Sequence, residues 1–237
     1  MKIITLFILM SCTLFSQNEK TVYITYKTQR KVDPNLKIDV PKGLENELSK
    51  FNKAIEDTEF YLIIKDSISL FKQIEKLNLD EVNGLANMMN SASYFVNNQS
   101  QKKIKQVETL GQKFNIIYPF DEYKWEITSE TKVINGYKCF KALSKKETFS
   151  LVRNRNIITR PEVWFTPEIP ISHAPFGLSG LPGLILEATL NGKLCYYANL
   201  INLDFKDNSY KIELPNKGKE ITERELEEMQ LKSINEN

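Results

Sequence analysis

The sequence predicts an α+β fold, mainly antiparallel β, in which a curved sheet or half-open barrel carries two or three helices on one face or end. Three observations support this. About ten short runs alternate apolar and polar residues. Turn signals such as Asn135-Gly136 separate them. The regular alternation of strand and helix that a parallel sheet needs is not visible. A closed sandwich or barrel is the alternative.

Composition describes an ordinary folded chain. Of 237 residues, 41% are hydrophobic and 26% are charged, close to the averages of globular proteins. This length favours one domain, which we place at 18–237. The net charge of +2 gives no strong attraction to nucleic acid or to an anionic membrane, so we expect no nucleic-acid partner.

Residues 1–17 are typical of a secretory signal peptide. Lys2 supplies the positive start, an apolar run follows to Phe15, and Ser16-Gln17 ends it. A rival interpretation makes Cys12 the lipid-anchored residue of a lipobox, but the apolar residues after it argue against a lipoprotein linker. We therefore expect an exported protein, periplasmic or associated with the outer membrane. We expect no transmembrane span in the mature chain.

The first half of the chain should begin with a half-buried strand over 21–32, because apolar and polar residues alternate there. Apolar residues at helical spacing over 42–57 predict an amphipathic helix. The further expected elements are a hairpin of 60–65 and 67–72, a short helix at 81–89, and strands at 93–96, 102–109 and 114–118.

The second half continues the sheet and ends in a helix. Its expected strands are 124–130, 133–134, 137–144, a ragged hairpin within 145–160, and then 162–166, 184–190, 194–205 and 210–214. Thr222 and Glu225 have the spacing of a capping box, which predicts the start of a C-terminal amphipathic helix.

The stretch Ile169–Leu186 is the most unusual part of the chain, because none of its 18 residues carries a formal charge. Its length would suit a membrane span. Pro170, Pro175 and Pro182 argue against a helix, since each interior proline costs roughly 3 kcal/mol. We therefore predict an ordered, apolar, extended loop between two strands.

Such a loop has two interpretations that can both hold. It can be a rigid plug over the open end of the sheet, in which glycine permits close backbone approach. It can also form a wall of an apolar ligand pocket or a docking surface. On the second interpretation the candidate ligand- or partner-binding residues are Trp164, Phe165, Phe176, Leu178, Leu181, Pro182 and Leu184.

Three motifs point to a known family. Gly180–Ile185 reads G-L-P-G-L-I, Trp164–Pro170 reads W-F-T-P-E-I-P, and Asn135–Cys139 reads N-G-Y-K-C. From about Thr21 to its end the chain resembles the GLPGLI family, small exported proteins of Bacteroidetes also described as Porphyromonas gingivalis-type. The resemblance implies an exported protein, and no activity or site residue transfers with it. Phe176–Ser179 departs from the family's usual approach to the hexapeptide.

Residues able to hold a metal are scarce. The one histidine, His173, lies in the uncharged loop, and beyond Cys12 there are two cysteines, Cys139 and Cys195. This set cannot supply a zinc site of the usual kind, and we expect no metal or cofactor. An exported location permits a Cys139–Cys195 disulfide, and the alternative is two buried, inert thiols.

Three functions remain open. The first is a non-enzymatic protein that binds an apolar ligand or an envelope protein through the concave sheet and its loop. The second is a hydrolase that uses Glu168 and Glu187 as an acid/base pair, since both flank the loop. The third is an accessory subunit of an outer-membrane uptake or secretion system.

Overall fold

The computed structural model describes residues 20–31, 43–75, 91–207, 210 and 212–235. Its helical elements are α1 (Glu45–Glu56), the 3-10 turn η1 (Pro175–Gly177) and α3 (Glu223–Asn235). Its strands are β1 (Thr21–Arg30), β2 (Glu59–Lys65), β3 (Ile68–Gln73), β4 (Ser93–Asn97), β5 (Lys102–Thr109), β6 (Gln112–Tyr118), β7 (Glu126–Ile134), β8 (Tyr137–Leu143), β9 (Lys146–Ser150), β10 (Arg155–Thr159), β11 (Glu162–Thr166), β12 (Leu184–Thr189), β13 (Leu194–Phe205) and β14 (Lys219–Ile221).

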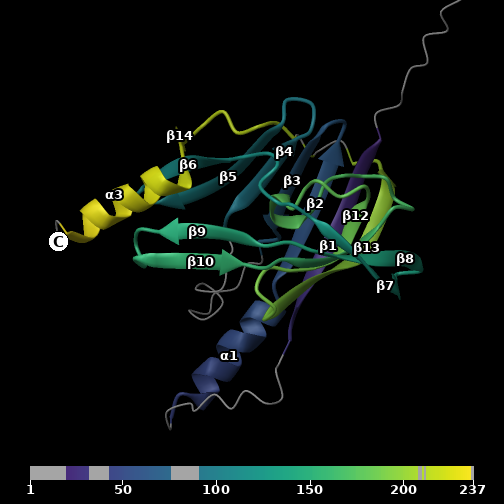
Figure 1. Cartoon of the computed structure of the whole chain (residues 1–237), viewed down its shortest axis with the longest axis horizontal. Coiled ribbons are helices and arrows are strands. Elements are labelled where there is room, and N and C mark those ends of the chain that lie inside the picture. The colour runs from purple at the N-terminus through teal and green to yellow at the C-terminus, as the bar shows by residue number, and fades with distance from the viewer. Residues whose placement is uncertain (1–19, 32–42, 76–90, 208–209, 211, 236–237) are drawn as a thin grey trace, which may run out of the picture.

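Twelve of the strands in the described part of the chain form one open sheet in the order β14-β6-β5-β4-β3-β2-β1-β13-β12-β11-β8-β7. The sheet curves, with α3 at its β6–β14 end and α1 below β1 (Figure 1). The remaining two strands, β9 and β10, pair only with each other and run as a separate ribbon in front of the sheet. The predicted fold class, a curved and mainly antiparallel sheet with few helices, is confirmed.

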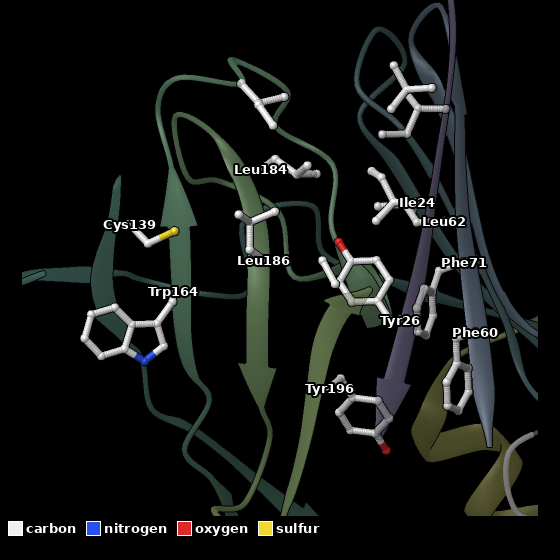
Figure 2. Close-up of a cluster of buried hydrophobic side chains, with 14 residues drawn as sticks. Ile24, Tyr26, Phe60, Leu62, Phe71, Cys139, Trp164, Leu184, Leu186 and Tyr196 are labelled. Atoms are coloured by element: carbon white, nitrogen blue, oxygen red, sulfur yellow. The ribbon is translucent and has the colours of Figure 1, made fainter. Parts of the chain in front are cut away.

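The central strand β1 shows why these residues form a sheet. Val22, Ile24 and Tyr26 are buried, and they alternate with half-buried neighbours, as a strand with period two requires. The hydroxyl of Tyr26 donates a hydrogen bond to the carbonyl of Ile185, 2.7 Å away, which satisfies a phenol that is otherwise fully buried. Figure 2 shows Tyr26 beside Phe60 and Phe71 in the main core.

The loop between β11 and β12 is ordered and fills the concave side of the sheet. It contains η1, which contacts β3 and β4 although these strands lie far from β11 and β12 in the sheet order. Phe176 adopts a left-handed backbone (φ 56°) and places its ring 4.5 Å from that of Tyr196 and 4.7 Å from that of Phe71, between centroids. The expected plug is therefore present, and it joins two distant parts of one curved sheet.

Several expected elements agree with the structure. The capping box at the start of α3 forms, because the backbone N–H of Thr222 donates to Glu225 at 2.7 Å and that of Glu225 donates to the Thr222 hydroxyl at 3.2 Å. The hairpin expected within 145–160 is β9–β10, although it stands apart from the main sheet. The helix expected at 81–89, the leader 1–17 and Cys12 lie outside the described residues.

The C-terminal end differs from the expectation in two ways. The described residues of 210–214 form no strand, because Tyr210 packs its ring 5.8 Å from that of Tyr23 and Pro215 disfavours continued pairing. The chain then adds the three-residue strand β14 parallel to β6, which was not expected.

Within the described part of the chain, no helix is both long enough and apolar enough to cross a membrane.

Of the two alternatives for Cys139 and Cys195, the structure has the second, because both residues are free, buried thiols. Cys139 lies in β8 and Cys195 in β13, and β11 and β12 separate these strands. Three strand spacings amount to about 14 Å, whereas a disulfide requires Cα atoms within roughly 7 Å. Burial is the main cause that raises the pKa of Cys139 to about 11 and that of Cys195 to about 12, so both thiols stay protonated.

Candidate functional site

A cavity of about 550 Å³ lies between the inner face of β4, β5 and β6 and the hairpin β9–β10. The turn η1 closes one side and the first turn of α3 the other. Such a volume is typical of a small-molecule pocket. Its lining includes basic, acidic and tyrosine side chains from all of these elements, so the candidate site is built by the tertiary fold and not by one local motif.

A buried ion pair forms the floor of the cavity. Lys103 Nζ lies 2.6 Å from Oε1 of Glu122, with side-chain exposures of only 4% and 7%. The second carboxylate oxygen of Glu122 accepts from Lys146 Nζ at 2.7 Å. Burial lowers the pKa of Lys103, and the charge of Glu122 opposes that shift. The carboxylate of Glu122 is therefore the counter-charge of both Lys103 and Lys146.

Lys105 is the unusual group of the site. It follows Lys103 by two residues in β5, so both side chains lie on the inner face. Within the described residues it makes no ion pair or hydrogen bond, and its ammonium lies 5.7 Å from the centroid of the Tyr94 ring. Burial lowers its pKa, and the charge of Glu223 only partly offsets this. Lys105 is therefore a partly buried cation without a direct ion pair, and it is available for an anionic ligand group.

Three tyrosines supply ring faces and phenol groups to the cavity, namely Tyr94, Tyr118 and Tyr123. The Tyr118 hydroxyl donates to Oε1 of Glu223 at 3.1 Å. Burial is the largest cause that raises the pKa of all three phenols, so each keeps its proton and can donate. Lys146 lies 5.0 Å from the centre of the Tyr118 ring.

The hairpin β9–β10 forms the roof, and it is tied down at its tip. Glu227 of α3 accepts from the Ser150 hydroxyl and from the backbone N–H of Leu151, each at 2.6 Å. At the other end, the Ser144 backbone N–H donates to the Pro161 carbonyl at 3.0 Å. The roof is therefore an ordered wall of the site.

Most of the residues that the sequence analysis proposed for binding are core residues. Phe176 alone among them lines the cavity, and Pro182 is exposed. The Trp164 ring is covered by Lys132 Nζ, 4.3 Å from its centre. The other five predicted residues are buried, with exposures of 9% or less for Trp164, Phe165, Leu178, Leu181 and Leu184.

The two carboxylates proposed for acid/base chemistry are engaged separately. Glu187 lies 2.5 Å from Lys132 Nζ and 3.7 Å from Lys31 Nζ. Glu168 is exposed beyond the end of β11 and accepts from the backbone N–H of Lys138 at 2.9 Å. In the described part of the chain no group of three or more histidine, cysteine or acidic residues could hold a metal ion.

The lysines of the cavity are visible in the sequence but are not among the residues that the sequence analysis proposed for binding. The period of two already places Lys103 and Lys105 together. What the sequence does not show is that a hairpin more than forty residues later covers this face. The lysines Lys103 and Lys105 lie next to strands that carry tyrosines, and this pattern is the sequence signal from which the site could have been predicted.

Comparison with known proteins agrees with this architecture. Two structures of PNGF-II match: one in space group C2 (16% identity, TM-score 0.55) and one in P21 (18% identity, TM-score 0.54). Each match covers 90% of this chain, which spans only about a third of the length of PNGF-II (33% and 34%). At such identities the likeness shows the fold. No curated protein matches the chain.

A protein-family profile matches residues 65–224, and its description is "N-glycanase peptide, N-terminal domain". The matched segment contains the strands β4, β5 and β6, the hairpin β9–β10 and the plug loop, and thus nearly the whole candidate site. Because this match extends over more than half of the sequence, the chain belongs to the family of N-glycanase peptide N-terminal domains.

Proposed function

We propose that this chain is a non-catalytic binding domain that holds an acidic glycan in the cavity roofed by β9–β10. The observation that carries the proposal is Lys105, a desolvated cation with no ion-pair partner among the described residues, on the inner wall of that cavity. Partial burial of an ammonium that has no direct ion pair costs stability, and an anionic ligand group in the cavity would offset that cost.

The rest of the lining fits a sugar. Tyr94 and Tyr123 offer ring faces on which the apolar side of a saccharide can pack. The protonated phenols, the lysines and the carboxylates supply both donors and acceptors for hydroxyl groups. The family description, which names an N-glycanase, supports a glycan as the ligand class.

This proposal keeps the binding role expected from the sequence and changes the chemistry of the ligand. An apolar ligand was expected because the loop is apolar, but the loop's leucines are packed in the core. We also propose that the chain is exported, periplasmic or associated with the outer membrane, as its leader-like residues 1–17 and its resemblance to the GLPGLI family imply.

Calorimetric titration with a sialylated N-glycan and with the same glycan after removal of sialic acid tests the proposal. We expect the sialylated form to bind more tightly. Lys105→Met should weaken its binding at least about tenfold, because one desolvated charge contact is lost. The same variant should be no less stable than the wild type, since the cost of partly burying the ammonium is removed.

Lys102→Met is the matched control, because Lys102 lies in the same strand and is exposed. It should leave glycan affinity unchanged. Equal affinity of the Lys102 and Lys105 variants, or no binding of either glycan to the wild type, would refute the proposal. If the chain binds a fluorescent fatty acid and neither glycan, the ligand is apolar, as the sequence analysis expected.

A second candidate function is an accessory role within a larger envelope assembly. It is favoured by the comparison with PNGF-II, in which the matched fold occupies about a third of a longer chain. The test is to extract the tagged chain from native membranes under mild conditions. A single membrane partner in fixed stoichiometry is expected, and a monomeric chain alone would contradict the role.

A further inference from the structure

A second hollow, the basic groove, lies next to the cavity and has a volume of about 840 Å³. Strand β10 forms one wall, and the turn between β12 and β13 forms the other. Five cations line it against one carboxylate, Glu162. The five are Lys31, Arg153, Arg155, Arg160 and Lys193. Because the whole chain carries a net charge of only +2, this groove concentrates positive charge locally.

Most of this positive charge is not compensated. Among the described residues, the side chains of Arg153, Arg155, Arg160 and Lys193 have no ion-pair partner. The one carboxylate of the lining, Glu162, is already neutralised, since it lies 3.7 Å from Lys31 Nζ and 3.5 Å from Lys141 Nζ. The groove therefore presents several free cations at once.

Both walls of the groove are held in place. The backbone N–H of Gly192 donates to the Thr189 hydroxyl at 2.8 Å, which fixes the β12–β13 turn. The backbone N–H of Lys31 donates to the Lys193 carbonyl at 2.9 Å, so the end of β1 is tied to the same turn. On the other side β10 pairs along its whole length with β9. A ligand would meet a preformed surface.

We propose that the basic groove binds a linear acidic polysaccharide that carries carboxylate or sulfate groups. Guanidinium groups bind such anions through paired N–H donors. Arg155 and Arg160 are five residues apart, which corresponds to about 17 Å of extended strand and thus to a few consecutive sugar units. This spacing suits a chain of regularly placed anions better than one compact phosphate.

Continuity with the cavity selects a saccharide over other polyanions. Arg153, Ile157 and Asn191 line both the cavity and the groove, so a sugar chain with one end in the cavity can continue along β10. The groove lining contains no aromatic ring, which disfavours single-stranded nucleic acid, because its bases need stacking partners. The choice of a saccharide rests on the proposed function of the cavity. The evidence for an anionic ligand is the set of cations in the groove and does not depend on that proposal.

The experiment measures binding of two probes to the full chain at about 0.15 M salt. One probe is a heparin-derived hexasaccharide, which carries sulfates, and the other is hexagalacturonate, which carries carboxylates. R155Q/R160Q, which changes only arginines that line the groove and not the cavity, should weaken the better probe by at least about tenfold, and its affinity should then depend less on salt, because fewer counter-ions are exchanged. The two probes distinguish which anion the groove prefers.

The matched control is K50Q/K217Q, which removes the same charge from exposed lysines outside the groove. It should change affinity less than about twofold, because distant exposed charges are screened at this salt concentration. Equal weakening by the control, or tighter binding of a hexaglutamate peptide or of single-stranded DNA of the same charge, would overturn the proposal.

Lys105→Met separates this inference from the proposed function. If the groove binds polyanions but the cavity holds no glycan, the Lys105 variant keeps full affinity for the better probe and the arginine variant loses it. If the cavity alone binds, the arginine variant binds the hexasaccharides as the wild type does, which would refute the inference while leaving the proposed function intact.

Discussion

Gly183 packs so tightly against Thr166 that a Cβ atom at Gly183 would lie 2.1 Å from the Thr166 carbonyl oxygen. No side chain can move to relieve this contact, because the obstacle is backbone. Gly183→Ala should therefore lower the free energy of unfolding by at least about 3 kcal/mol, measured by urea denaturation. The glycine is required by a close approach and not by a turn.

Gly111→Ala is the control for this prediction. Gly111 has a positive φ of 71°, but an added Cβ would meet nothing within 4 Å. Only the left-handed conformation is penalised there, at about 1 kcal/mol. Equal losses in the two variants would contradict the steric explanation.

Leu181→Asp should unfold the protein and not merely abolish binding. Leu181 is 3% exposed within the core cluster that includes Leu178 and Ile185. An unpaired carboxylate at this position should cost at least about 4 kcal/mol. Pro182→Ala, at an exposed neighbouring position, should stay folded with a similar melting temperature. Circular dichroism distinguishes the outcomes, and a folded Leu181→Asp would show that the loop is less embedded than described.

Glu122→Gln should destabilise the chain by about 3 kcal/mol or more, because it leaves Lys103 buried without a counter-charge. The double variant Lys103→Met/Glu122→Leu should recover most of that loss, since it removes both buried charges. Glu108→Gln breaks the exposed Lys113–Glu108 pair and should cost less than about 1 kcal/mol. Chemical denaturation of the wild type, Lys103→Met, Glu122→Leu and the double variant completes the cycle. Strictly additive losses at Lys103 and Glu122 would argue against the pair.

Stability should fall between pH 6.5 and pH 5 because of His173. Burial lowers its pKa to about 4, from an ordinary value near 6.5. As the pH falls, the imidazole of His173 binds a proton in the unfolded chain but stays neutral in the folded chain. The free energy of unfolding is therefore about 2 kcal/mol lower at pH 5 than near neutral pH. His173→Gln, which cannot titrate, should show a flatter profile. The chain contains one histidine. If the variant has the same pH profile as the wild type, other titrating groups cause the pH dependence.

The strands were predictable because each depends on its own residues. Alternation over 21–32 marked β1, Asn135-Gly136 marked the turn between β7 and β8, and the Thr222–Glu225 spacing marked the start of α3. The candidate site was not predictable in the same way. Lys103 and Lys105 belong to a site only because β9–β10 covers them. Trp164 and Leu181, which were proposed as binding residues, are buried because the loop packs inward.

Local pattern alone therefore established the strand periodicity, the turn positions and an uncharged loop that cannot be a helix, because φ/ψ preference and side-chain alternation act over a few residues. Tertiary packing decided which faces lose water. It joined β3 and β4 to η1, separated Cys139 from Cys195 by two strands, and partly buried Lys105 without a direct ion pair. Desolvation depends on segments far apart in the chain, and no local pattern encodes it.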